Sequence, residues 1–295
     1  MADMTGTTMA TWLPEQWSQL ATITYRSNTV IWPLLDRRWE PELPAGRGDT
    51  VNIPSFSQNT SATGRGSNVS STTFGTGASL TFDAVTESQV QLVVNQLAYK
   101  AFRIPVEMAV QTMPNYVSLL TDGIGEAIAL KMDSDVAADG TNGFDAFTAI
   151  GTDGVDVTDD VILAAETNLN DQFAPMSDRF AVISPATRAS LMKIDTYRNS
   201  LYGGSVGNMD GSKGAGYLGQ IYSLDFYMSG NLEAGSSGKK NAVFHREAIA
   251  GVVQSNVTMV ADQNIEDGLF NQVAGYSVYG YKLVKTAFGR EVDGQ

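Results

Sequence analysis

The sequence predicts an α+β protein, and three observations lead to that class. The run from Val85 to Ile104 has the alternating apolar residues of a long strand. The run from Asn115 to Ala138 keeps a helical period instead. Between residues 158 and 194 a helix, a short apolar strand and a second helix follow one another, so this region is α/β rather than all-β. The whole chain is therefore expected to be a mixed α+β body.

Composition limits the classes of function. At 295 residues and 43% hydrophobic residues, the chain can form one large or two ordinary domains. It has no cysteine, which excludes disulfides, thiolate metal sites and thiol catalysis. A net charge of −13 argues against tight binding to nucleic acid or to an anionic membrane. No run is apolar enough for a membrane span, and the N-terminal residues do not have the pattern of a signal peptide.

The N-terminal residues 12–39 have the features of an arm. Pro14 suits a first helical turn, and Trp17 lies on the apolar face of the helix that would follow. Trp12, Trp17 and Trp32 are three of the four tryptophans in the chain. Large aromatic residues gathered near a terminus suggest that the terminus docks on another surface. Ordinary packing in the core is the alternative.

Residues 57–79 form a long polar segment between strand-like stretches. Fifteen of these 23 residues are Ser, Thr or Gly. A structureless loop of this length is uncommon inside a compact domain. It has too little apolar surface to offset its ordering entropy. We therefore expect it to become ordered along a neighbouring copy of the same protein.

The element from Val85 to Ile104 is expected to be one long strand. Its alternation changes phase near Asn95, which predicts a bulge or a bend. The helix from Asn115 to Ala138 is the strongest in the chain, and at 1.5 Å per residue it would be roughly 36 Å long. An aromatic strand from Tyr276 to Lys285 has the length and pattern to pair with Val85–Ile104.

The region after residue 157 is expected to form an inserted lobe. Thr158 can cap the helix that follows it, and Ser184 with Pro185 opens another helix. Strands are predicted at 180–183, 221–228 and 242–244. Residues 202–219 are rich in glycine and are expected to form a loop.

An acidic block extends from Met132 to Asp178. It holds eleven carboxylates and no Lys or Arg. A solvated face is the favoured interpretation. The alternative is a divalent-cation site, although no EF-hand spacing supports it. Its candidate ligands would be Asp153, Asp156, Asp159 and Asp160.

A nucleophile-elbow pattern occurs at residues 203–207, with Ser205 at its centre. Asp225 and His245 follow in the chain order of an α/β-hydrolase triad. The context does not fit, because no buried strand precedes the serine and no helix follows it. A serine hydrolase that uses Ser205 is thus a remote alternative. We expect His245, the only histidine, to be a structural residue at a strand end.

The order of elements resembles the HK97-like fold of the major capsid proteins of tailed double-stranded DNA bacteriophages. Residues 179–186 and 218–227 look especially similar to this family. The resemblance implies five parts: an N-terminal arm (1–45), an extended loop (46–84), a peripheral domain with a long spine helix (85–157), an axial domain (158–260), and return strands of the peripheral domain (261–295).

The function implied by the resemblance is structural. Copies would assemble into hexamers and pentamers of an icosahedral shell around double-stranded DNA, without tight specific binding to it. The protein would lie in the virion capsid and assemble in the host cytoplasm, with no enzymatic activity and no cofactor. Its partners would be further copies of itself, a separate scaffolding protein, a portal and a decoration protein. An encapsulin-type shell of a cellular nanocompartment is the alternative.

Five residues are candidates for contacts between subunits. Trp12 and Trp17 would dock the arm. Arg47 and Arg65 are the only cations of the extended loop, and we expect them to meet carboxylates of a neighbour. Phe74 lies in the same loop and completes the set. Because this loop has no lysine, we expect none of the isopeptide cross-links that some members of the family form.

Overall fold

The computed structural model describes residues 29–43, 48–56, 87–107, 116–194, 197, 216–264 and 270–295. Within these ranges the chain forms three β-sheets and three α-helices. This confirms the predicted mixture of helix and sheet. None of the helices in these ranges is long and apolar enough to cross a bilayer.

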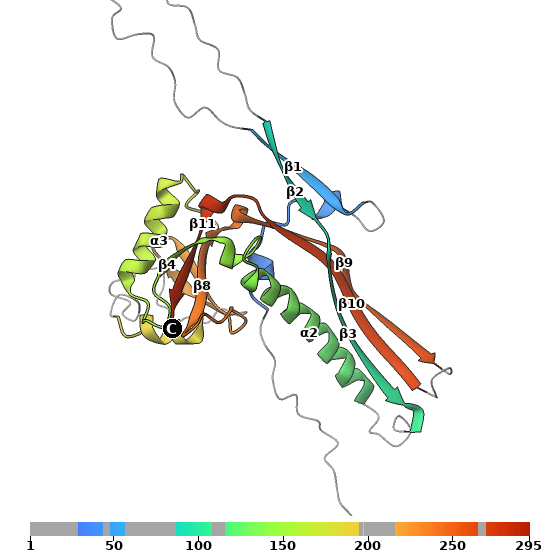
Figure 1. Ribbon diagram of the computed structural model, residues 1–295. Helices are drawn as coiled ribbons and strands as arrows, with labels where there is room; N and C mark the ends of the chain where they lie inside the picture. The colour runs from blue at the N-terminus through green and yellow to red at the C-terminus, as the bar shows by residue number, and fades with distance from the viewer. Residues whose placement is uncertain are drawn as a thin grey trace, which may run out of the picture.

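The elongated half of the molecule is a three-stranded antiparallel sheet with one long helix on it (Figure 1). The strand order is β3 (Gln96–Pro105), β10 (Phe270–Leu283), β9 (Ile249–Asn264). Helix α2 (Tyr116–Ala138) lies along this sheet and confirms the predicted helix to within one residue. The predicted strand pairing is also confirmed, because Tyr276 of β10 is opposite Tyr99 of β3.

A two-stranded sheet extends away from the rest of the molecule (Figure 1). It pairs β1 (Thr50–Phe56) with β2 (Glu87–Val93) in antiparallel register. The prediction of a single strand over Val85–Ile104 is wrong, because β2 ends at Val93 and β3 begins at Gln96 in another sheet. The change of phase near Asn95 marks this crossing. Gly280 of β10 packs so closely on the crossing that a Cβ there would overlap the Val93 carbonyl oxygen.

The second half of the molecule contains a six-stranded mixed sheet. The β4–β11 and β5–β7 pairs are parallel, and the other pairs are antiparallel. Helices α3 (Asp159–Asp171) and α4 (Pro185–Leu191) belong to this half. The strand order is β4 (Thr148–Gly151), β11 (Gly289–Gly294), β8 (Lys239–His245), β5 (Arg179–Ile183), β7 (Leu224–Met228), β6 (Tyr217–Ile221).

Local predictions in this half are mostly confirmed. Strands β5 and β8 contain the predicted segments 180–183 and 242–244. The predicted strand 221–228 is wrong, because it is a hairpin whose turn residues Tyr222 and Ser223 have φ of 52° and 62°. Residues 217–219 also belong to strand β6 rather than to a loop.

The two helices of this half begin with different caps. Thr158 precedes α3 as expected, but its side chain makes no capping hydrogen bond. Ser184 caps α4, because its Oγ accepts the Thr187 N–H at 3.0 Å. The prediction of a capping side chain at Thr158 is thus wrong, and the predicted helix start at Ser184 and Pro185 is confirmed.

The sheets do not follow the boundaries expected from the sequence. Strand β9 begins at Ile249, inside the range 158–260, yet it pairs with β10 in the three-stranded sheet. Strand β11 lies in the range 261–295, yet it joins the six-stranded sheet between β4 and β8. The range expected to hold only return strands therefore contributes to both halves.

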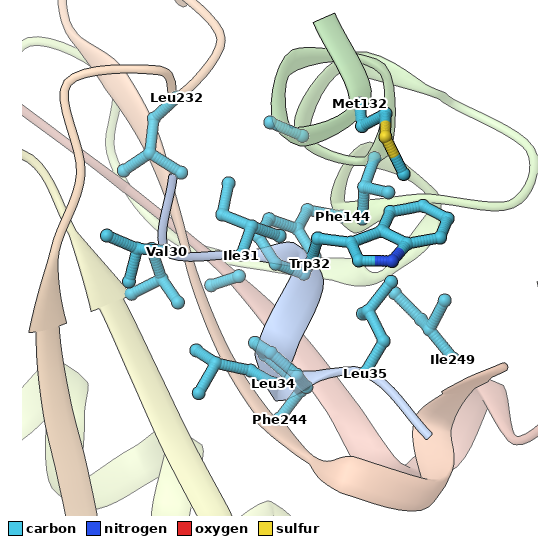
Figure 2. Packing of buried hydrophobic residues seen from close by; sticks show 14 of the residues in the cluster. Val30, Ile31, Trp32, Leu34, Leu35, Met132, Phe144, Leu232, Phe244 and Ile249 are labelled. Atoms are coloured by element: carbon cyan, nitrogen blue, oxygen red, sulfur yellow. The ribbon is translucent and has the colours of Figure 1, made fainter. Parts of the chain in front are cut away.

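A short N-terminal segment fills the junction between the two halves (Figure 2). Residues 30–35, which include η1 (Trp32–Leu34), lie between α2 and the six-stranded sheet and contribute five buried apolar side chains. The Trp32 ring meets the Tyr279 ring edge to face at 5.4 Å. For Trp32, the structure shows packing in the core rather than docking on another surface.

Candidate functional site

The three-stranded sheet has one covered face and one open face. Ala98 and Phe102 of β3 point toward α2 and pack in the core below it. The alternate residues Leu97 and Tyr99 point to the opposite side and are 59% and 72% exposed. Exposed apolar side chains that gather on one surface mark a site of interaction.

Residues of the other two strands extend this open face. Tyr276 of β10 is directly opposite Tyr99, and Thr258 of β9 is opposite Tyr276. Two residues further along the same face, Val260 of β9 is opposite Ala274 of β10. The Val260 side chain is large, apolar and exposed. Since directly paired residues share a face, these side chains form one continuous surface across all three strands. We call this surface the open sheet face.

The position of α2 on the covered face depends on Gly275. A Cβ at this residue would overlap Ile124 of α2 and would lie 2.7 Å from Met259 Sδ. Glycine is required here because the helix approaches the strand too closely for any side chain. The open sheet face is thus backed by α2, packed closely on the other side of the sheet.

A buried carboxylate fixes the N-terminal segment to α2. Asp133 is fully buried and accepts three main-chain hydrogen bonds. The donors are the N–H groups of Val30, Ile31 and Trp32, at 2.6, 3.1 and 2.9 Å. Burial raises the pKa of Asp133, and these hydrogen bonds oppose that shift. The sequence analysis missed this residue. Its signal is a carboxylate within the apolar period formed by Ile128, Met132 and Val136.

The acidic block does not form a single solvated face. Asp133 is buried, and Asp135 faces Tyr279 of β10. Within the described ranges there is no group of three or more His, Asp or Glu residues that could hold a metal ion. Three of the four carboxylates considered for a cation site, all but Asp160, instead bond to separate protein groups: Asp153 to Ser237, Asp156 to Ser190 and Lys193, and Asp159 to Tyr197 and Tyr222.

His245 ends strand β8 and is buried, as the sequence predicted for a structural histidine. Its Nδ1 accepts the Glu247 N–H at 3.2 Å. Burial lowers the pKa of His245, so the ring is neutral at pH 7. Strand β5 lies between His245 and Asp225 of β7, so the structure does not bring together these two residues of the hypothetical triad. Ser205 lies outside the described residues.

A charged recess of about 620 Å³ lies beside His245. It is lined by residues 35–38, by the loop before β5 and by η4 (Arg246–Ala248). Its charges are paired within the protein: Arg38 with Asp36 at 2.6 Å and with Glu247 at 3.2 Å, and Arg246 with Asp178 at 3.2 Å. The Arg38–Glu247 pair joins the N-terminal segment to η4, which follows the central strand β8.

The five residues predicted to contact other subunits are not placed by the structure. Trp12, Trp17, Arg47, Arg65 and Phe74 all lie outside the described residues. The open sheet face was not predicted as a contact surface. Its signal in the sequence is the alternation of Leu97 and Tyr99 with residues that face the core.

No known family profile matches the sequence, and neither does any curated protein. Solved structures do match over almost the whole chain. One, from Mycobacterium phage Che8, is 21% identical with a TM-score of 0.73, and the match covers 96% of this chain and 98% of that one. The capsid structure of cyanophage P-SCSP1u is 15% identical with a TM-score of 0.66, over 98% and 94% of the two chains.

A third match is the asymmetric unit of the mature capsid of bacteriophage PhiM1. It is 11% identical with a TM-score of 0.67, and the match covers 96% of this chain and 91% of that one. The match in fold extends across both halves of the molecule, although the sequence identities are low. The chain has the HK97-like fold of phage capsid structures.

Proposed function

We propose that this protein is the major capsid protein of a tailed bacteriophage. The observation that carries the proposal is the coverage of the matches. The chain and the cyanophage P-SCSP1u capsid chain match over 98% and 94% of their lengths. The described part therefore contains both halves of a shell subunit. The open sheet face supports the same function, because a shell subunit needs surfaces for its neighbours.

In this function the protein acts by binding other copies of itself. Copies form hexamers and pentamers that close an icosahedral shell around double-stranded DNA in the virion, after assembly in the host cytoplasm. The net charge of −13 suits a shell wall that holds the genome without gripping its phosphates. A separate scaffolding protein, a portal and a decoration protein are the expected partners. No enzymatic activity or cofactor is part of the proposal.

The arm (1–45) and the extended loop (46–84) are the segments that we propose to reach neighbouring subunits. Trp12 and Trp17 anchor the arm, and Arg47, Arg65 and Phe74 contact the adjacent copy. Deletion of residues 1–25 would then impair assembly while the subunit still folds. Assembly and thermal stability that are unchanged in Arg65→Glu would rule out an important contact for that residue.

The test of the function is negative-stain electron microscopy of the protein expressed alone and with candidate scaffolding proteins. Closed shells or capsomer rings support the proposal. A monomer or dimer in every condition contradicts it. The ultraviolet absorbance ratio of purified particles then separates a DNA-filled capsid from a nanocompartment that encloses proteins. On a denaturing gel the subunits should run as monomers, because the extended loop has no lysine for isopeptide cross-links.

A further inference from the structure

The loop after α3 carries two exposed apolar side chains. It runs from Phe173 to Asp178, and we call it the α3 end loop. Phe173 is 90% exposed and Met176 is 68% exposed. Neither belongs to the buried clusters of the described residues or to the open sheet face. Two large apolar residues on one short loop need an explanation.

The backbone at Phe173 makes the exposure more informative. Helix α3 ends in a Schellman motif, in which the Phe173 N–H donates to the Asn170 carbonyl and the Ala174 N–H donates to the Leu169 carbonyl. Phe173 occupies the left-handed position of this motif, with φ of 56°. Glycine is the usual residue there, because any side chain adds strain. The chain thus has a large aromatic residue where glycine would be more stable, and the ring faces solvent.

Buried groups hold the α3 end loop in one shape. Arg179 is only 1% exposed, and its guanidinium donates to the Pro175 carbonyl at 2.7 Å and to the Ala174 carbonyl at 2.6 Å. Asp178 is ion-paired with Arg246 at 3.2 Å. A loop fixed in this way loses little conformational entropy on binding, so it is preorganised for a contact.

A groove on the other half of the molecule has complementary chemistry. It measures about 320 Å³ and lies between the edge strand β3 and helix α2. Residues Leu97 to Lys100 of β3 and Ala127 and Ile128 of α2 line it. Because Leu97 and Tyr99 point away from α2, the apolar side chains inside the groove are those of Ala98, Ala127 and Ile128. Lys131 of α2 also lines it. The Lys131 side chain is ion-paired with Asp135, yet it remains 60% exposed.

The charges around the two features are opposite. The exposed carboxylates Asp171 and Asp178 stand at the two ends of the α3 end loop, whereas the groove carries Lys100 and Lys131. We propose that the α3 end loop of one copy docks into the β3–α2 groove of the next copy, with Phe173 and Met176 on its apolar lining. This contact rests on the proposed function. It joins two different surfaces, so repetition of the same contact around an axis generates a ring.

The first test is the substitution Phe173→Gly. It was chosen because it should not destabilise the subunit, so that a loss of assembly would report the loss of the contact and not a folding defect. Glycine relieves the left-handed backbone, so the melting temperature of the subunit should stay the same or rise. Loss of the aromatic ring should weaken the contact by roughly tenfold or more, with fewer rings and shells in electron micrographs. Val155→Ala is the control, because Val155 is 53% exposed on a different loop. Assembly of Phe173→Gly at the wild-type level overturns the docking.

The second test uses the absence of cysteine from the natural chain. Copies with Met176→Cys and copies with Ala127→Cys, a lining residue of the groove on α2, are coexpressed with tags of different mass and treated with a short thiol cross-linker. The docking predicts a mixed dimer on a denaturing gel, and little product when either variant is expressed alone. Shells without the mixed dimer overturn the docking but not the proposed function. If neither variant nor the wild type forms any assembly, both are overturned.

Discussion

The Tyr279 hydroxyl donates a hydrogen bond to Asp135 Oδ2 at 2.5 Å, and this bond fastens β10 to the last turns of α2. Tyr281 adds a second bond to the Asp135 carbonyl oxygen at 3.1 Å. The two tyrosines are two residues apart on the strand, so both point to the helix. The layer of helix and sheet is thus joined by polar bonds as well as by apolar packing.

Tyr279→Phe tests the first of these bonds. The variant keeps the ring that packs on Trp32 and removes only the hydroxyl. Asp135 retains its ion pair with Lys131, so it is not left alone. We expect the free energy of unfolding to fall by about 1–2 kcal/mol in urea denaturation. An unchanged midpoint and slope would show that the hydroxyl contributes nothing to stability.

Asp133→Ala should detach the N-terminal segment. It leaves the buried N–H groups of Val30, Ile31 and Trp32 without their acceptor, and we expect a loss of about 3–5 kcal/mol in stability. Limited proteolysis should then cut the chain near these residues first. Asp122→Ala is the matched control, because Asp122 lies on the same helix and is exposed. Equal effects of the two substitutions would contradict an anchoring role for Asp133.

Gly275→Ala should force α2 and β10 apart. The added methyl group overlaps Ile124, so we expect a loss of about 1–3 kcal/mol, measured by thermal unfolding. Gly123→Ala serves as the control, since Gly123 lies in α2 next to Ile124 and a Cβ there would meet no other atom within 4 Å. That control should gain up to about 1 kcal/mol from helix propensity. A similar gain for Gly275→Ala would show that the close approach is not tight.

Glu291 should make stability depend on pH near neutrality. Burial raises its pKa to about 7, against the opposing charge of Lys240 at 3.7 Å. Lys240 is shared with Asp145 and with Glu233, and Asp293 also faces Glu291. Between the ordinary pKa of a glutamate and pH 7, the folded state keeps a proton that the unfolded state has lost. The contribution of Glu291 to the free energy of unfolding is therefore largest at low pH and decreases as the pH rises to about 7.

Glu291→Gln should abolish this part of the pH dependence. The measurement is the melting temperature from pH 5 to pH 8 for wild type and variant under equal salt. The wild type should lose stability toward neutral pH more steeply than the variant does. Glu42→Gln is the control, because Glu42 is exposed. Parallel curves for wild type and Glu291→Gln would remove Glu291 as the titrating group.

The sequence predicts the elements whose signal is local. The apolar period of α2 gives its bounds to within one residue, and the aromatic pattern of β10 identifies its pairing with β3. The sequence does not predict the hairpin at Tyr222, because its turn has no glycine or proline to mark it. The crossing from β2 to β3 is marked in the sequence only by the change of phase in the apolar alternation near Asn95. Alternation alone does not show which sheet a strand joins.

The parts that were missed depend on residues far apart in the chain. Strand β4 is four residues long and pairs with β11, about 140 residues later, so neither has a local signal of its partner. Asp133 gains its role from main-chain groups about 100 residues earlier. The candidate contact residues of the arm and the extended loop remain predictions, and the open sheet face emerged only when the strand register was known.

The position of β11 has a consequence for synthesis on the ribosome. Strand β11 stands between β4 and β8, and in the described part of the chain β4 pairs with no other strand. The six-stranded sheet therefore stays divided until residues 289–294 leave the exit tunnel. Until then β4 and one side of β8 present unsatisfied main-chain groups, which favour aggregation when many nascent chains are close together. Completion of the six-stranded sheet therefore waits for β11, which delays lateral association of subunits until residues 289–294 have emerged.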